Sequence, residues 1–252
     1  MGKPKIWPDN LLAHDDAELT ADSEASEHPA VNMADWRSTK TWRAGSLAQV
    51  IIDIIIPVFS GPVMGIIVYG AKTLAGQTLT LEYQNAPNWI WCGDIIINPL
   101  GRAYQQIFNM GPMPQNFRLT IPAQVSDPAE IGILYFGEEI ELPQWISFGQ
   151  FDPHGKQFTR EGLTSSEGIL LGNVDGFSLY SHKLDFRGVP NDWVETNLSK
   201  IWDSSACFFC WEPMNHITDL QLCRVVNPDR RANFSAPGVR DLTIQLEGEV
   251  PS

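Results

Sequence analysis

Short apolar segments separated by Gly, Pro and Asn dominate residues 49–137, and their spacing is that of strands. Residues 49–56 and 63–70 are rich in Ile and Val, whereas residues 78–83 alternate apolar and polar side chains. β-branched side chains and a period of two favour β-strands, and Ser-Gly-Pro at residues 60–62 is typical of a turn. Several short strands with this punctuation predict a β-sandwich or jelly roll.

The same region contains further strand-like segments at residues 88–92, 116–121 and 131–137. Between them, residues 101–108 are compatible with one or two helical turns that end at the Gly-Pro-Met-Pro sequence of residues 111–114. We interpret residues 101–108 as a loop-like excursion between two strands.

The second half of the chain has a different pattern, in which one helix interrupts a set of strands. Residues 176–186 alternate as a strand does, and residues 207–213, 220–226 and 239–248 are also strand-like. The region therefore predicts a β-rich domain with a single helix.

The predicted helix covers about residues 191–202, and Asn191 or Asp192 is the expected N-cap. Its large apolar residues fall along one stripe, as expected of a helix packed on a sheet. They are Trp193, Val194, Leu198, Ile201 and Trp202.

A change of pattern near residue 143 suggests a domain boundary. We expect a lead-in at residues 1–9, a sandwich domain at residues 10–142 and a β-rich domain at residues 143–252. A chain of 252 residues with 43% hydrophobic residues is long enough and apolar enough for two ordered cores.

The net charge of −13, from 30 acidic and 17 basic residues, argues against sequence-specific nucleic-acid binding. Residues 50–70 are apolar, but Asp53 and Pro57 interrupt them within the length that a bilayer helix needs, so we expect no membrane span. The first residues lack the pattern of a secretory signal, and we expect the protein to remain in the cytoplasm until it is assembled into something larger.

The usual signatures of catalysis are missing from the sequence. There is no Gly-x-Ser-x-Gly, no phosphate-binding loop, no dinucleotide fingerprint and no His-Glu-x-x-His. We therefore expect no enzyme activity.

Four cysteines are the sharpest candidates for a metal or cluster site: Cys92, Cys207, Cys210 and Cys223. Four thiolates hold zinc or an iron–sulfur cluster in many proteins, and Cys207-x-x-Cys210 has a permitted spacing. However, these two cysteines lie in a strand-like segment without the glycine turn of a metal knuckle, and residues three apart on a strand point to opposite faces. We favour buried reduced thiols and expect no cofactor.

Eight of the nine tryptophans fall into two groups. Those on predicted strand or helix faces are most simply core residues: Trp89, Trp91, Trp193, Trp202 and Trp211. Trp36, with its neighbour Arg37, Trp42 and Trp145 lie near loops or domain edges, where aromatic side chains serve sugar stacking or subunit interfaces. We favour interfaces for these residues.

The sequence His-Pro-Ala-Val-Asn-Met-Ala-Asp at residues 28–35, followed by Trp42-Arg43 and the strands at 49–56 and 63–70, resembles the start of galactose-binding-like (discoidin-type) jelly rolls. The strands at 116–121 and 131–137 resemble the closing pair of that fold. Such a domain joined to a second domain of this size resembles the distal-tail and baseplate (minor tail) proteins of long-tailed bacteriophages. The helix-containing C-terminal domain is similar to the ring-forming fold of tail-tube and distal-tail proteins.

This resemblance implies a structural virion protein of a phage tail, assembled in the host cytoplasm. Three or six copies would form a ring around the tail axis, in contact with the tail tube, the hub, the tape measure or the fibres. The alternative is a carbohydrate-binding module that contacts a saccharide of the host surface. A third hypothesis is a metalloprotein that uses the four cysteines.

Overall fold

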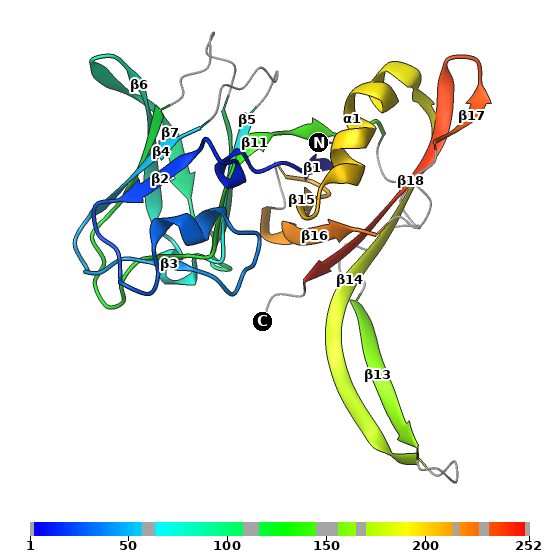
Figure 1. Ribbon diagram of the computed structural model, residues 1–252, viewed down its shortest axis with the longest axis horizontal. Helices are drawn as coiled ribbons and strands as arrows, with labels where there is room; N and C mark the ends of the chain where they lie inside the picture. Colours follow the sequence, from blue (N-terminus) through cyan, green and yellow to red (C-terminus); the bar gives the residue numbers. More distant parts are fainter. Residues whose placement is uncertain are drawn as a thin grey trace. The chain divides into compact units, whose positions relative to one another are not determined.

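The computed structural model describes residues 3–56, 64–107, 116–144, 156–164, 170–213, 217–226 and 232–249. The chain forms two compact units (Figure 1). The sandwich unit contains Trp7–Ile140 and Met214–Thr218, and the second unit contains Met1–Ile6, Glu141–Pro213 and Asp219–Ser252. Both units are mainly β, as the sequence predicts.

The sandwich unit contains two main antiparallel sheets. The five-stranded sheet has the order β2 (Glu18–Ala21), β4 (Val50–Ile55), β9 (Asn116–Ile121), β6 (Thr78–Asn85) and β7 (Asn88–Ile96). The three-stranded sheet has the order β11 (Ile133–Glu138), β5 (Met64–Tyr69) and β8 (Arg102–Ile107). A smaller pair joins β3 (Trp42–Arg43) to β10 (Glu130–Ile131), and the 3-10 helices η1 (Leu11–Ala13), η2 (Ala30–Ala34) and η3 (Lys72–Leu74) lie in the connections.

The core of the sandwich unit is made by alternate residues of its strands. In the five-stranded sheet, Leu119 of β9 is in register with Ile52 of β4 and Leu81 of β6, and all three side chains are fully buried. From the three-stranded sheet, Phe136 packs against Phe117 of β9, with ring centroids 4.8 Å apart. The alternation that the sequence predicts for residues 78–83 is confirmed in β6, and buried residues also alternate along β4 and β9.

The loop-like excursion expected at residues 101–108 is wrong, because this segment contains the strand β8 paired along β5. The polar residue Arg102 is 3% exposed, and its Nη1 donates to the carbonyl of Thr218 at 2.8 Å. Its guanidinium also lies 5.1 Å from the ring centroid of Tyr69. The polar side chains of Arg102, Gln105 and Gln106 leave this segment without the apolar alternation by which a strand is recognised in a sequence.

The second unit is built on one sheet, described in the order β12 (Ile140–Glu141), β1 (Lys5–Trp7), β15 (Cys207–Cys210), β16 (Gln221–Val225), β18 (Val239–Glu249), β14 (Leu170–Pro190) and β13 (Lys156–Thr164). The strand β17 (Ala232–Ala236) also pairs with β18, and the 3-10 helix η4 (Ile217–Asp219) precedes β16. The strand β1 comes from residues that the sequence pattern assigned to a lead-in.

The helix α1 (Asn191–Asp203) lies beside β14 and β18 (Figure 1), and its span agrees with the prediction. Val194, Leu198 and Ile201 are its buried residues. The predicted N-cap is wrong, because Pro190 occupies that position without a side-chain hydrogen bond. The Asn191 side chain instead accepts a hydrogen bond from Nε of Arg240 at 3.0 Å.

No helix in the described part of the chain has both the length and the apolar character needed to cross a membrane.

Candidate functional site

The solvent-facing side of the five-stranded sheet carries two tryptophans that the sequence pattern assigned to the core. Trp91 of β7 is 62% exposed, and its neighbour Trp89 is half-buried. In register, Trp91 lies opposite Glu82 of β6, and Trp89 lies opposite Gln84. We call this surface the tryptophan face and define it by Trp89, Trp91, Asp94, Glu82, Gln84, Asn116, Arg118 and Asp53.

A β-bulge at Cys92 explains why the two tryptophans face solvent. Leu81 pairs with Gly93, but the next residue, Glu82, pairs with Trp91, so Cys92 is the extra residue in β7. An extra residue reverses the faces to which the following side chains point. Ile95 is therefore buried, whereas Trp91, which has the same odd-numbered phase, is exposed.

Trp91 is held at one edge and open on its surface. Its indole N–H donates to Oδ1 of Asp94 at 3.2 Å. This hydrogen bond orients the ring from one edge, and 62% of the residue remains accessible. An oriented, exposed aromatic ring is a suitable surface for stacking a ligand.

Trp89 is covered by a cation that is itself held in place. The guanidinium carbon of Arg118 lies 4.1 Å from the centroid of the Trp89 ring. Nε of Arg118 donates to Oδ1 of Asp53 at 2.8 Å, so the guanidinium is anchored from β4 on its other side. A cation–π contact of this kind stabilises the ring position by about 0.5–1 kcal/mol at an exposed site.

The remaining groups of the tryptophan face are carboxylates and amides. Nδ2 of Asn116 donates to Oε1 of Gln84 at 2.6 Å. Glu82 lies between Arg118 and Trp91 in register across the three strands β9, β6 and β7. The face therefore combines an open indole with hydrogen-bonding side chains around it.

A surface of this composition matches the two sides of a sugar ring. The C–H groups of one ring face are apolar and gain from burial against indole, while hydroxyl groups at the ring edge need acceptors and donors. Carboxylates are strong acceptors for such hydroxyls. Such an arrangement can hold a ligand by stacking and by hydrogen bonds.

The candidates chosen from the sequence occupy different places. Trp42 is fully buried in the core of the sandwich unit, which leaves no face of its indole for a ligand or a partner and corrects the expectation for this residue. Trp36 is half-buried, with its ring centroid 5.9 Å from that of Tyr135. Trp145 lies outside the described residues.

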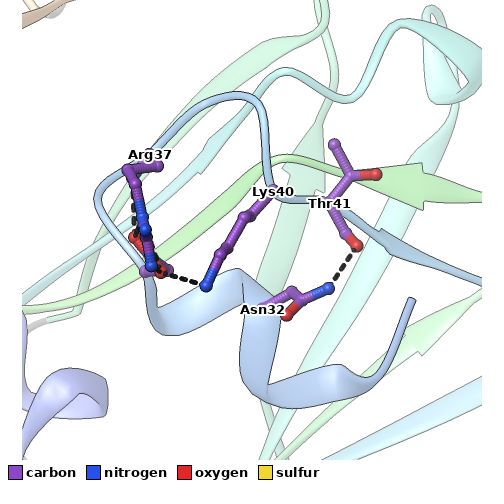
Figure 2. Close-up of polar contacts among 5 residues, drawn as sticks. Asn32, Arg37, Lys40 and Thr41 are labelled. Atoms are coloured by element: carbon purple, nitrogen blue, oxygen red, sulfur yellow. Dashed lines mark hydrogen bonds and ion pairs between the residues drawn. The ribbon is translucent and has the colours of Figure 1, made fainter. Parts of the chain in front are cut away.

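The charge of Arg37 is paired with a carboxylate of its own loop (Figure 2). The guanidinium of Arg37 and the ammonium of Lys40 converge on Asp35, with Nε of Arg37 at 2.8 Å from Oδ1 and Nζ of Lys40 at 3.2 Å from Oδ2. The hydrogen bond from Arg37 holds the pKa of Asp35 well below its usual range. In the same loop, Nδ2 of Asn32 donates to the carbonyl of Thr41 at 3.0 Å.

The cysteines do not form a ligand set in the described part of the chain, where no three His, Cys, Asp or Glu side chains gather as metal ligands do. Cys207 and Cys210 are buried on β15, and Cys223, on β16, is in register with Cys207. Cys92 belongs to the sandwich unit. Burial raises the pKa of the Cys207 thiol to about 12 and also raises the pKa of Cys92.

No family model matches the sequence, and no match to a curated protein was found. Solved structures with a similar fold include the module CpGH89CBM32-5 from Clostridium perfringens in complex with GalNAc-β-1,3-galactose, with a TM-score of 0.43, 14% identity, and coverage of 52% of this chain and 100% of that one. They also include the family 32 module of NanJ from C. perfringens in complex with galactose, with a TM-score of 0.41, 12% identity, and coverage of 53% and 99%.

A fucosidase of Ruminococcus gnavus is similar over 53% of this chain, with a TM-score of 0.41 and 14% identity. The match covers only 27% of the fucosidase chain. Likenesses of this size concern the β-sandwich fold and carry no inference about what this protein binds.

Proposed function

We propose that the protein is a carbohydrate-binding protein and that the tryptophan face of its sandwich unit is the binding surface. The observation that carries this proposal is the exposure of Trp91, an oriented aromatic ring on a sheet whose other face is a well-packed core. Trp91 is joined on β7 by the half-buried Trp89 and by Ile96, which is 68% exposed, and neighbouring exposed apolar side chains of this kind mark interaction sites. The hydrogen-bonding side chains around Trp91 favour a hydroxyl-rich ligand over a purely apolar one.

In this proposal, Trp91 contacts the ligand and Arg118 is a positioning residue. One ring of the saccharide stacks on the open surface of Trp91, while Glu82 and Asp94 accept hydrogen bonds from its hydroxyl groups. Arg118 keeps Trp89 in place beside the ligand, because it stacks on that ring and is tied to Asp53. The surface is preorganised, which reduces the entropic cost of binding.

A single open indole predicts weak affinity. Covering one side of Trp91 buries roughly 100 Å² of apolar surface, which contributes about 2.5 kcal/mol at about 25 cal/mol per Å². The hydrogen bonds add less, because each replaces one to water. We expect a dissociation constant of about 0.1–1 mM for a short oligosaccharide, since association itself is costly.

The test is to screen a glycan array and to titrate the best oligosaccharide by calorimetry. Trp91→Ala should weaken binding roughly 50–100-fold, which corresponds to the loss of the stacking contribution. Two control variants should leave binding unchanged. Trp36→Ala removes a candidate that was chosen from the sequence, and Val125→Ala changes an apolar residue outside the sheet that is 95% exposed. Binding that is lost with Trp36→Ala but unchanged with Trp91→Ala would contradict the proposal, as would the absence of any glycan ligand.

A second candidate function is that of a structural protein of a phage tail tip, of the distal-tail or baseplate kind. It is favoured by the 21-residue strand β14, whose residues Leu179–Pro190 pair with β18 while Leu170–Tyr180 pair with β13. The two strands thus form an arm that continues beyond β18 within their unit (Figure 1). An extended two-stranded arm can bridge to a neighbouring copy in a ring.

This second candidate predicts rings of three or six copies in the virion that contact the tail tube, the hub, the tape measure or the fibres. Light scattering across a concentration series, with negative-stain images of any large species, tests it. Discrete trimers or hexamers would support the ring, and a monomer at all concentrations would speak against it.

A further inference from the structure

The carboxylates around Trp91 outnumber the cations on the tryptophan face. Trp91 is opposite Glu82 in register and is hydrogen-bonded to Asp94. In the described part of the chain, Glu82 forms no hydrogen bond or ion pair through its side chain. Two carboxylates therefore flank the open indole. Asp94 already accepts a hydrogen bond from Trp91, whereas the carboxylate of Glu82 can accept hydrogen bonds from a ligand.

The single cation of this face is not available to a ligand. Arg118 is joined to Asp53 through Nε at 2.8 Å and through Nη2 at 3.4 Å, and its guanidinium covers Trp89. This surface carries three carboxylates, Asp53, Glu82 and Asp94, but only the one guanidinium of Arg118. Two negative charges are therefore left unbalanced. An anionic saccharide is repelled by such a surface, whereas a cationic one is attracted.

We propose that the tryptophan face selects saccharides that carry a free, protonated amine, such as β-1,4-linked glucosamine. This inference rests on the proposed function and names its substrate class. The ammonium group lies against the exposed indole of Trp91 and donates to Glu82 and Asp94. Cation–π attraction and charge-assisted hydrogen bonds then act on the same group.

N-acetylation removes both interactions, because an acetamide has no charge. Discrimination between the amine and the acetamide is therefore the signature of this site. The amine form should bind at least ten times more tightly than its N-acetylated counterpart when the amine is protonated.

The experiment is a calorimetric comparison of a glucosamine hexamer with an N-acetylglucosamine hexamer at low salt. At about pH 5.5 the amine of the ligand is protonated. The preference should decrease as the pH rises through the pKa of the amine, and it should also decrease in high salt because charge attraction is screened. Glu82→Gln should reduce the preference about 3–10-fold, because the amine form loses a charge-assisted hydrogen bond and the N-acetylated form loses only neutral ones.

Glu18→Gln is the matched control, since Glu18 is exposed on β2 at the opposite edge of the same sheet. It should leave the preference for the amine unchanged. Equal affinity for the two hexamers, a preference for the N-acetylated one, or an unchanged preference in Glu82→Gln would overturn the inference.

The outcomes separate this inference from the proposed function. If both hexamers bind equally and Trp91→Ala abolishes binding of both, the carbohydrate-binding function stands and the amine selectivity is wrong. If neither hexamer nor any glycan of the array binds, the proposed function itself fails, and the selectivity with it. If a lysine oligomer binds more tightly than the glucosamine hexamer at the same site, the surface takes a basic peptide and the saccharide assignment is overturned.

Discussion

The side chain of Asn10 occupies the outer edge of β11, where the described part of the three-stranded sheet has no further strand. Its Nδ2 donates to the carbonyl of Leu134, and its Oδ1 accepts from the N–H of Phe136, both at 3.1 Å. Residues two apart on a strand direct these groups to the same edge, so one carboxamide satisfies both. Asn10 is 1% exposed, and water does not reach this site easily.

Asn10→Ala should therefore destabilise the sandwich unit strongly. It leaves the buried carbonyl of Leu134 and the buried N–H of Phe136 without partners, and it also removes the longer hydrogen bond, 3.3 Å, that Oδ1 accepts from the N–H of Leu12. Each unsatisfied group costs about 1–3 kcal/mol, so the two groups of the strand edge alone predict a loss of roughly 2–6 kcal/mol. Asn10→Asp should be no better at neutral pH, because a carboxylate oxygen would then face the carbonyl oxygen of Leu134.

Hydrogen exchange measured by mass spectrometry reports the stability of this unit separately from that of the second unit. In Asn10→Ala, peptides covering Ile133–Glu138 should exchange at least about 30-fold faster, which corresponds to 2 kcal/mol or more. Asn88→Ala, at an exposed position of β7, is the matched control and should change exchange little. A loss below about 1 kcal/mol in Asn10→Ala would refute the view that one carboxamide completes this strand edge.

Three further predictions concern single residues. Arg37 lowers the pKa of Asp35 below its ordinary value of 3.8, and a lowered pKa adds stability above that value which is lost as the pH falls through the folded pKa. Acid titrations followed by fluorescence should therefore find Asp35→Asn less stable than the wild type at about pH 6 and equal to it in strong acid; a constant difference would contradict this. In the native protein at about pH 8, a thiol reagent should modify Cys92 before Cys207, because the latter is completely buried with a pKa of about 12; peptide mapping that finds the reverse order would sink the prediction. Gly137→Ala should cost about 1–3 kcal/mol in urea unfolding, because the added methyl group would overlap the carbonyl oxygen of Asp9; an unchanged midpoint would exclude this clash.

The local pattern of apolar and polar residues was sufficient to predict the strands and the helix whose buried side follows from their own sequence. The strand-like segments at residues 49–56, 116–121 and 131–137 correspond to β4, β9 and β11, and the predicted helix corresponds to α1. In β4, β9 and α1, the period of the apolar residues reports which side faces a core, whereas β11 is a nearly continuous buried run. The mainly β class with one helix was therefore predictable.

The tryptophan face was not predictable in this way, although its residues are plain in the sequence. An unbroken alternation along β7 would direct Trp91 inward together with Ile95. The bulge at Cys92 reverses that direction, and the bulge exists only through the pairing of β7 with β6. A hint was present in Cys92-Gly93, since a glycine within a strand often accompanies a bulge.

The sequence by itself determined the class of fold, the strands with regular alternation, the helix and the acidic charge, because these depend on residue type and local period. Only the tertiary structure decided that Trp42 is buried, that Trp91 is open, and that Arg102 is accommodated inside a strand by Tyr69 and Thr218. Each of these outcomes depends on a partner that lies far away along the chain. Register, bulges and buried polar contacts are set by such partners, and the local pattern of apolar and polar residues does not contain them.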